Sequence, residues 1–276
     1  MDLNTVEAVH VPRRREDLWP PRPGDAIVAG GTWLFSEPQP DITRLVDITA
    51  LGWPPVTLSD NGIELAATCT LAEVAELSTT LAHRRPDWIA APLFAQCCTA
   101  LLASAKVWHT ATVGGNICTS LPAGSMIALT SVLDATLQIW RGDETRTTTV
   151  AEFVTGAATN ALQAGDVLRS IHLPAVALRA RTAYRKLAPT SLGRSGVVVL
   201  GRRDDAGDGG TVTVSVTAAT VRPYLLTFPG LPSPQAQRDA LAQIPDSAWN
   251  TDVHGDPDWR AAMTTLLCHQ IVTELT

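Results

Sequence analysis

Segments with strand-like and helix-like residue patterns follow one another in this chain without the regular strand–helix alternation of parallel α/β folds. Runs of apolar and β-branched residues predict strands at residues 26–29, 167–173 and 211–219. Apolar spacing and capping residues predict helices at residues 70–81, 92–105 and 258–275. We therefore expect the α+β fold class. The 276 residues suffice for two domains, which we predict as residues 1–176 and 177–276.

The composition excludes some classes of partner. Hydrophobic residues make up 45% of the chain, enough for a sizeable core, and the formal net charge is −6. Nucleic acid and anionic membrane surfaces both favour a basic face, so we expect neither as a partner. The longest apolar region, residues 89–105, is interrupted by Pro92 and Gln96 and is short for a membrane span. The N-terminus, with Asp2 and Glu7, has no signal-peptide pattern, so we expect a cytoplasmic protein.

The five cysteines and six histidines do not have the spacing of a metal site. Cys97 and Cys98 are adjacent, which suits neither a CxxC site nor an easily formed disulfide. No two histidines lie four residues apart. We therefore expect buried free thiols and no metal ligands.

Two glycine pairs are candidate anion-binding segments. Glycine has no Cβ and permits positive φ, so paired glycines let backbone N–H groups converge on an anion without help from Lys or Arg. The first segment follows a predicted strand and comprises Val28, Ala29, Gly30, Gly31, Thr32, Trp33 and Leu34. The second lies within residues 110–125, an expected loop, and comprises Thr112, Val113, Gly114, Gly115 and Asn116. The first segment is neither a Rossmann fingerprint nor a P-loop, and a lone glycine pair after a strand is usually only a turn.

Together with further motifs in the same order, these segments resemble the FAD-binding medium subunit of the xanthine dehydrogenase and carbon monoxide dehydrogenase family, the molybdenum hydroxylases. The matching motifs are AGGTWL at residues 29–34, TVGGN at 112–116, LDA at 133–135, DVLRSI at 166–171, YRK at 184–186 and HGDPDWR at 254–260. The resemblance covers nearly the whole chain. It implies an FAD-binding domain of the PCMH type with two α/β sub-lobes over residues 1–176, followed by a smaller α+β C-terminal domain over residues 177–276.

The resemblance also implies which residues contact FAD. By position, residues 29–34 would wrap the pyrophosphate, with Val28 a further cofactor-binding residue directly before them, and residues 112–116 would contact the phosphate, ribityl and flavin region. Leu168 would pack near the isoalloxazine, and Lys186 would lie close to the ring, where a cation stabilises reduced anionic flavin. Ser125 stands where the family usually has an aspartate that hydrogen-bonds the cofactor, so we expect that contact to be weaker or lost. We predict no catalytic residue.

The resemblance further implies a division of labour among subunits. A molybdopterin-binding large subunit would hydroxylate the substrate, and a small subunit would hold two [2Fe–2S] clusters. This chain would pass electrons from the clusters through FAD to NAD, oxygen, a quinone or another acceptor, within a heterotrimer or a dimer of heterotrimers. Its own cysteines lack the spacing to ligate a cluster. Two alternatives stay open: a self-contained flavin oxidoreductase, for which no convincing acid–base set is visible, and a flavin-free scaffold subunit, which Ser125 favours and the glycine pairs oppose.

Overall fold

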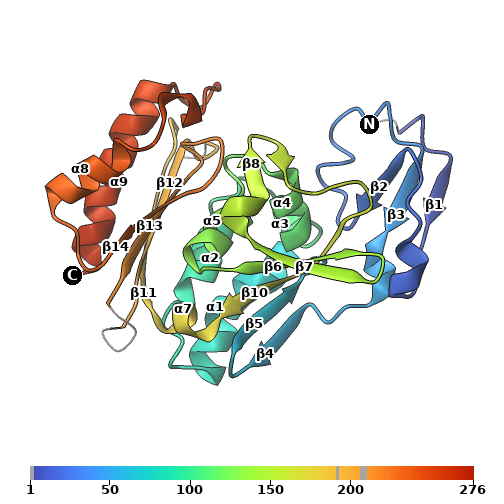
Figure 1. Cartoon of the computed structure of the whole chain (residues 1–276), viewed down its shortest axis with the longest axis horizontal. Coiled ribbons are helices and arrows are strands. Elements are labelled where there is room, and N and C mark those ends of the chain that lie inside the picture. Colours follow the sequence, from blue (N-terminus) through green and yellow to red (C-terminus); the bar gives the residue numbers. More distant parts are fainter. Residues whose placement is uncertain (1–2, 191–192, 206–209) are drawn as a thin grey trace.

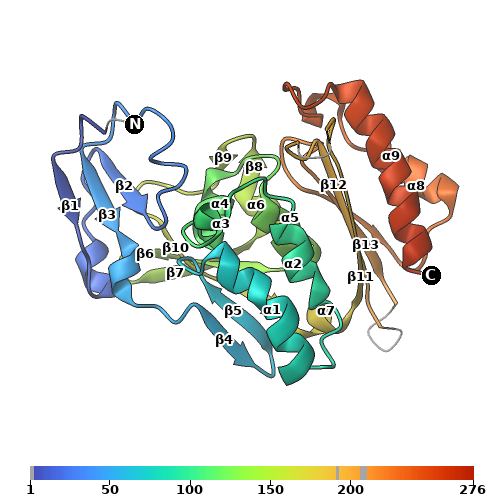
Figure 2. The ribbon, with the colours of Figure 1, turned by 180° about the vertical axis from the view of Figure 1, so that it is seen from behind.

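The computed structural model describes residues 3–190, 193–205 and 210–276. A small N-terminal sheet lies at one end of the molecule, and a five-stranded sheet with most of the helices lies in the middle (Figure 1). A four-stranded sheet with the two C-terminal helices lies at the other end (Figure 2). The two larger sheets are antiparallel and are mixed with helices, which confirms the predicted α+β class.

The N-terminal sheet places the first glycine segment. Its strands pair in parallel in the order β1 (Ala8–His10), β3 (Arg44–Asp47) and β2 (Asp25–Val28). Short 3-10 helices follow β1 and β3, at Arg15–Leu18 and Ile48–Leu51. The chain leaves β2 directly into the glycine segment. This sheet and the middle sheet share an apolar cluster of Leu18, Val46, Ile48 and Val167.

Stacked tryptophan and arginine side chains strengthen the same junction. The rings of Trp53 and Trp140 meet edge to face, with centroids 5.5 Å apart. The Arg169 guanidinium lies 4.5 Å from the Trp53 centroid and 5.5 Å from the Trp140 centroid. Arg15 lies 4.5 Å from the centroid of Trp140. Each such contact contributes roughly 0.5–1 kcal/mol when partly exposed, so the N-terminal sheet and its glycine segment are held against the rest of the chain.

The middle sheet packs one face against the main apolar core. Its strands are, in order, β4 (Val56–Ser59), β5 (Gly62–Ala66), β10 (Val167–Pro174), β6 (Thr136–Arg141) and β7 (Glu144–Thr149). Buried and partly exposed residues alternate along the first part of β6, as expected for a sheet with one face on a core.

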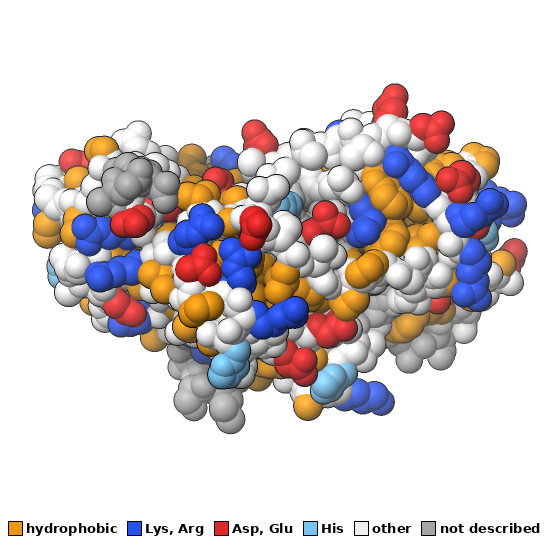
Figure 3. Space-filling view, turned by 90° about the horizontal axis from the view of Figure 1, so that it is seen from below, with side chains coloured by type: hydrophobic (Ala, Val, Ile, Leu, Met, Phe, Trp, Pro, Cys, Tyr) orange, Lys and Arg blue, Asp and Glu red, His pale blue; other side chains and the backbone are white. Residues whose placement is uncertain are grey.

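Seen from below, acidic and basic side chains are interspersed over the molecule rather than gathered by sign (Figure 3).

The helices of the middle part surround this core. They are α1 (Leu71–Arg84), α2 (Pro92–Cys98), α3 (Ala105–Trp108), α4 (Val113–Thr119), α5 (Ser125–Val132) and α6 (Val150–Phe153), with the short strands β8 (Val154–Gly156) and β9 (Thr159–Asn160) after them. Helix α1 begins at the predicted point. Thr70 and Glu73 cap it reciprocally, because the Thr70 N–H donates to the Glu73 carboxylate at 2.7 Å and the Glu73 N–H donates to Thr70 Oγ1 at 3.3 Å.

Two predictions for this region are wrong. The helix expected over residues 92–105 ends at Cys98, and residues 99–104 follow an irregular path before Ser104 caps α3. The loop expected over residues 110–125 contains helix α4. Local composition disfavours a helix with two glycines, but the Val113 and Gly114 N–H groups find acceptors in Cys69 O and Ala67 O, outside the helix.

The C-terminal part packs a sheet between two helices and α5. The strands, in order, are β11 (Arg181–Leu187), β12 (Val197–Arg203), β13 (Val212–Thr217) and β14 (Tyr224–Phe228). The helices are α8 (Pro234–Leu241) and α9 (Pro257–Glu274), with a 3-10 turn at Asp246–Ala248 between them. Valines alternate with hydroxyl residues along β13; the valines belong to the core that includes α9, and the strand also contacts α5.

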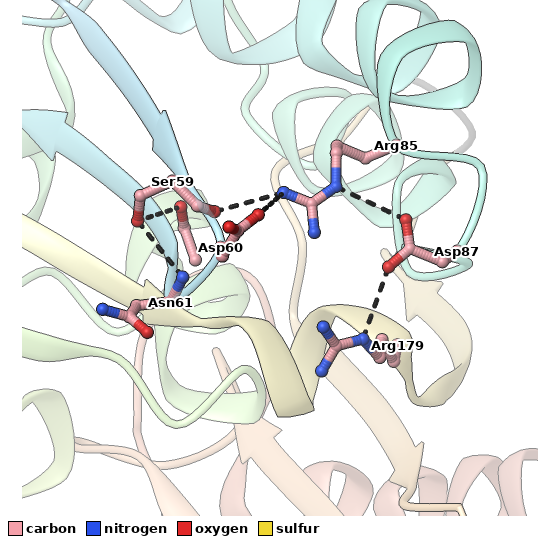
Figure 4. Close-up of polar contacts among 7 residues, drawn as sticks. Ser59, Asp60, Asn61, Arg85, Asp87 and Arg179 are labelled. Atoms are coloured by element: carbon pink, nitrogen blue, oxygen red, sulfur yellow. Dashed lines mark hydrogen bonds and ion pairs between the residues drawn. The ribbon is translucent and has the colours of Figure 1, made fainter.

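Helix α7 (Ala175–Arg179) joins the middle part to the C-terminal sheet. The Asp87 carboxylate accepts from Arg85 Nε and from Arg179 Nε, each at 3.4 Å, so it links α7 to the end of α1 (Figure 4). Arg85 also reaches Ser59 O at 3.2 Å. Exposed pairs of this kind contribute at most about 1 kcal/mol. The predicted domain boundary, between residues 176 and 177, falls within α7, and the division into two domains stays a prediction.

Free thiols are distributed through the cores. Cys69, Cys97, Cys98 and Cys268 are buried, as expected, whereas Cys118 is half-buried. In the described ranges, no three His, Cys, Asp or Glu side chains gather as metal ligands. Nor does any helix of that part of the chain combine the length and apolar character of a membrane span.

Candidate functional site

A cleft of about 720 Å³ brings the two glycine segments together. This volume lies within the roughly 300–1,000 Å³ typical of cofactor sites. All seven residues of the first segment line the cleft, and so do Thr112, Gly115 and Asn116 of the second. The rest of the lining comes from Ile27 and Gln39, from Ala100, Leu101, Leu102, Ala103, Val107 and Ala111, from Cys118, Thr119, Leu121, Ala123 and Gly124, and from Ala158 and Arg194.

The first glycine segment needs both of its glycines. A Cβ on Gly30 would overlap Thr110 O, so only glycine allows the segment to approach the chain before α4 this closely. Gly31 has a φ of +66°, and a Cβ there would overlap the edge of the Phe35 ring. The turn is closed by the Phe35 N–H, which donates to Gly31 O at 2.8 Å.

Backbone N–H groups of the first segment are free to bind a ligand. Among the described residues, the N–H groups of residues 30–34 make no hydrogen bond. These groups follow one another around a tight turn at the edge of the cleft. Successive free N–H groups in a turn form a concave anion-binding surface. The first segment therefore has the free donors that an anion-binding turn requires.

The same argument is wrong for the second segment, because its N–H groups are already hydrogen-bonded. Val113 and Gly114 donate to the backbone before α1, at 2.8 and 2.9 Å. Gly115 N–H donates to Thr112 Oγ1 at 3.1 Å, and Asn116 N–H donates to Thr112 O at 2.9 Å. A Cβ on Gly114 would lie 2.5 Å from the Cβ of Ala67. Gly114 is therefore required by packing, and this segment presents the surface of a capped helical turn to the cleft.

Five predicted site residues do not line the cleft. Ser125 is 1% exposed, directly after Gly124 of the lining, and its Oγ has no hydrogen-bond partner among the described residues. Leu168 is buried in β10 within the main core. Lys186 is exposed, and its Nζ donates to Thr99 O at 2.9 Å, at the start of the wall formed by residues 100–103. Val113 and Gly114 of the second segment are likewise buried beneath the cleft surface.

Sequence reasoning missed most of the other walls. Residues 100–103 were expected to be helical, and neither they nor residues 121–124 carry a motif of polar residues. Arg194 was missed as well, although it is the only charged side chain that lines the cleft in the described part of the chain. Its position beside Gly193 and before a predicted strand gives no local signal of a ligand site.

The cleft contains few groups that can exchange protons. In the part of the chain that the structure describes, neither a carboxylate nor a histidine lines it. Burial raises the pKa of the Cys118 thiol to about 12, so this side chain stays protonated near neutral pH. The cleft is thus mostly neutral, with one cation and a row of free N–H donors.

Known proteins resemble this chain in sequence and in fold. A family model described as the FAD binding domain in molybdopterin dehydrogenase matches residues 7–176. The nicotinate dehydrogenase FAD-subunit of Eubacterium barkeri is 26% identical over 213 residues, which cover 74% of this chain and 69% of that protein.

Solved structures share the fold over nearly the full length. A chain of carbon monoxide dehydrogenase from Hydrogenophaga pseudoflava, in a form that lacks the Mo-pyranopterin moiety of the molybdenum cofactor, has a TM-score of 0.80 at 19% identity and covers 97% of this chain and 96% of its own. A chain of quinoline 2-oxidoreductase from Pseudomonas putida 86 has a TM-score of 0.78 at 17% identity and covers 100% of this chain and 98% of its own.

Proposed function

The chain belongs to the family of FAD-binding domains of molybdopterin dehydrogenases, and we propose that it is the electron-transfer subunit of a molybdenum hydroxylase complex, relaying electrons from iron–sulfur clusters to an external acceptor. Its cofactor is FAD, and its activity is that of an oxidoreductase. When bound, FAD supplies a carrier that accepts two electrons and returns them to NAD, oxygen, a quinone or another acceptor.

The residues around the cleft fit this cofactor. We assign the free N–H groups of residues 30–34 to the diphosphate, because they can satisfy its oxygens without a basic side chain. Thr112, Gly115 and Asn116 line the same cleft, so we assign them to the remainder of the cofactor. The Ser125 hydroxyl does not line the cleft, but it follows Gly124 of the lining and has no partner among the described residues, so a polar group of the ligand that reached it would recover the free energy that a buried unpartnered hydroxyl costs.

We do not assign Leu168 a direct contact, since it is buried in the core and does not line the cleft. We assign Lys186 to the outer edge of the site, because its Nζ donates to Thr99 O, directly before the wall of residues 100–103. Val113 and Gly114 support the floor of the site from below.

The observation that carries the relay proposal is the lack of a general base. Oxidation of an alcohol or an amine by a flavin removes a hydride from carbon and a proton from oxygen or nitrogen, so a group in the site has to accept that proton, and no carboxylate or histidine lines the cleft in the described residues. Electrons from iron–sulfur clusters arrive one at a time and need no such group beside the flavin. The chemistry of the lining therefore favours a relay over direct oxidation of a substrate.

The proposed partners are a molybdopterin-binding large subunit and a small subunit with two [2Fe–2S] clusters, in a heterotrimer or a dimer of heterotrimers. The name of the Eubacterium barkeri relative, an FAD-subunit, supports an assembly of this kind. We place the complex in the cytoplasm.

An anaerobic titration tests the relay. The FAD-loaded chain is mixed with a reduced two-iron ferredoxin, two equivalents per FAD, or with nicotinate, quinoline or an aldehyde, and the flavin absorbance is followed. We expect bleaching with the ferredoxin alone. Bleaching by an organic compound at an ordinary enzymatic rate would instead identify a self-contained oxidoreductase, and failure to retain FAD after reconstitution would identify a scaffold. Co-expression with the two partner subunits followed by gel filtration tests the assembly.

A further inference from the structure

The cleft wall at residues 121–124 is flanked by backbone in a conformation that L-residues rarely adopt. Ser120, Ala158 and Ala218 have φ values of 53°, 54° and 62°. The Ala158 N–H donates to Ser120 O at 2.9 Å, and the Ala218 N–H donates to Pro122 O at 2.7 Å. Such residues persist only where the surrounding structure imposes their conformation, and they cluster at functional sites. The shape of this wall is therefore imposed partly from outside, by Ala218 at the end of β13.

Arg260, in the first turn of α9, is the side chain that fixes Ala218. It is 1% exposed, and its Nη1 donates to Ala218 O at 2.7 Å and to Gly196 O at 2.5 Å. Its Nε donates to Gly255 O at 3.0 Å. Its Nη2 pairs with Asp252 Oδ1 at 2.5 Å, which balances the buried charge.

The contact with Gly196 links the same guanidinium to a second wall of the cleft. Gly196 follows Arg194, which lines the cleft, and Ser195, whose Oγ donates to Ala100 O at 3.2 Å. Ala100 begins the wall of residues 100–103. One buried side chain thus joins two walls that are far apart in sequence.

We propose that Arg260 is a positioning residue for the cofactor cleft, holding Ala218 O and Gly196 O so that the walls at residues 121–124 and 100–103 keep the spacing that the cofactor requires. This inference rests on the proposed function, because the ligand is FAD. It gives the C-terminal helix a part in cofactor binding, although Arg260 does not line the cleft.

The planar guanidinium is suited to this task. Its donors point in fixed directions, so it can hold three carbonyl groups and a carboxylate at once. A lysine in its place has one nitrogen on a flexible stem and cannot reproduce the three directions. The substitution Arg260→Lys therefore keeps the buried charge and removes the geometry.

The test compares Arg260→Lys with a matched control, Arg203→Lys. Arg203 also belongs to the C-terminal part, and its Nη1 donates to Leu275 O at 2.8 Å, at the end of α9, but it does not line the cleft. For the native chain and each variant, the Kd of FAD is measured by fluorescence titration, the visible circular dichroism of bound FAD is recorded, and the apo protein is unfolded in urea. A purely structural role would lower the urea midpoint of both variants without changing the flavin spectrum.

We expect Arg260→Lys to raise the Kd of FAD about tenfold and to change the visible circular dichroism, while Arg203→Lys leaves both unchanged. A folded Arg260→Lys variant with a Kd within twofold of native overturns the inference. If that variant does not fold, Ser195→Ala decides by the same twofold limit, because it removes the bond from Ser195 Oγ to Ala100 O that connects the segment before Gly196 with the wall of residues 100–103. A native chain that binds no FAD at all contradicts the proposed function, which is a separate outcome.

Discussion

Replacing Gly31 by alanine tests whether the free N–H groups of the first glycine segment bind the cofactor. Gly31 has a φ of +66°, a conformation that costs an L-residue about 1–2 kcal/mol. The added Cβ would also overlap the edge of the Phe35 ring. That ring is 45% exposed and can rotate away, so the backbone strain is the larger effect.

The backbone strain of Gly31→Ala can appear in the stability of the apo protein or in the Kd of FAD, depending on how firmly the turn is held without ligand. Within the described ranges, the N–H groups of residues 30–34 make no hydrogen bonds that would keep the turn in place without ligand. The bond that Gly31 itself makes in this turn is the one that its carbonyl accepts from Phe35 N–H. Gly31→Ala can give up that bond and relax in the apo protein, and the strain is restored only when the N–H groups must converge again on the diphosphate. A cost of about 1–2 kcal/mol then appears as a rise in the Kd of FAD of roughly 5- to 30-fold, with little change in apo stability.

The control is Gly142→Ala. Gly142 has a φ of +56°, and a Cβ at this residue would have no described atom within 4 Å, but the residue lies in the turn between the paired strands β6 and β7. The ladder holds that turn, so the same strain should lower the free energy of unfolding and leave the Kd unchanged. Fluorescence titration with FAD and urea unfolding of the apo forms separate the two cases. If Gly31→Ala destabilises the apo protein and binds FAD within twofold of native, Gly31 is only a structural turn residue.

Four further outcomes follow from the same geometry. Gly114→Ala should destabilise the apo and FAD-bound forms alike, by about 1–3 kcal/mol, because the new Cβ would overlap Ala67 in the core. The melting temperatures of both forms should therefore fall together. Ser125→Asp should destabilise the apo protein and tighten FAD binding by roughly 1.5–3 kcal/mol. The rise in melting temperature on adding FAD should therefore be larger than in the native chain, and a smaller rise would contradict a contact between residue 125 and FAD. Arg194→Gln should raise the Kd of FAD by up to about fivefold and reduce its dependence on salt concentration. Burial raises the pKa of Asp166, but the hydrogen bond from Arg146 and further contacts outweigh burial and hold that pKa below the usual range. The stability that the Asp166 carboxylate contributes is therefore present above pH about 4 and is lost as the pH falls through the pKa of the folded state. In Asp166→Asn, the urea midpoint should depend less on pH in this window.

The sequence predicted the features that depend on local patterns. The α+β class, the strand before the first glycine segment and the capping box at Thr70 were correct because each depends on residues close together in the chain. The motifs also predicted that the two glycine segments belong to one site, and both line the cleft. This inference came from the order of motifs along the chain, since nothing in the local pattern states that Gly30 lies against Thr110.

The features that the sequence did not predict depend on distant partners. A glycine pair looks the same whether its N–H groups are free or bonded, and only the position of Ala67 and Cys69 decides that the second segment becomes a helix. Residues 99–104 have a helical composition, yet two of their carbonyl groups accept hydrogen bonds from side chains of the C-terminal part, Thr99 O from Lys186 and Ala100 O from Ser195. Composition does not report such long-range contacts.

Lys186 shows which properties of a residue a motif match predicts and which it does not. Its place after Tyr184 put it beside the flavin by resemblance, and it does lie next to a wall of the cleft. Its Nζ, however, donates to Thr99 O, and the Tyr184 ring packs against the main core. A lysine has three donors, so the contact with Thr99 leaves its charge and two donors available at the edge of the site. The motif therefore predicts where this residue lies in the fold, whereas the atoms it contacts are decided by the irregular segment after α2, which differs in conformation from the helix that its sequence favours.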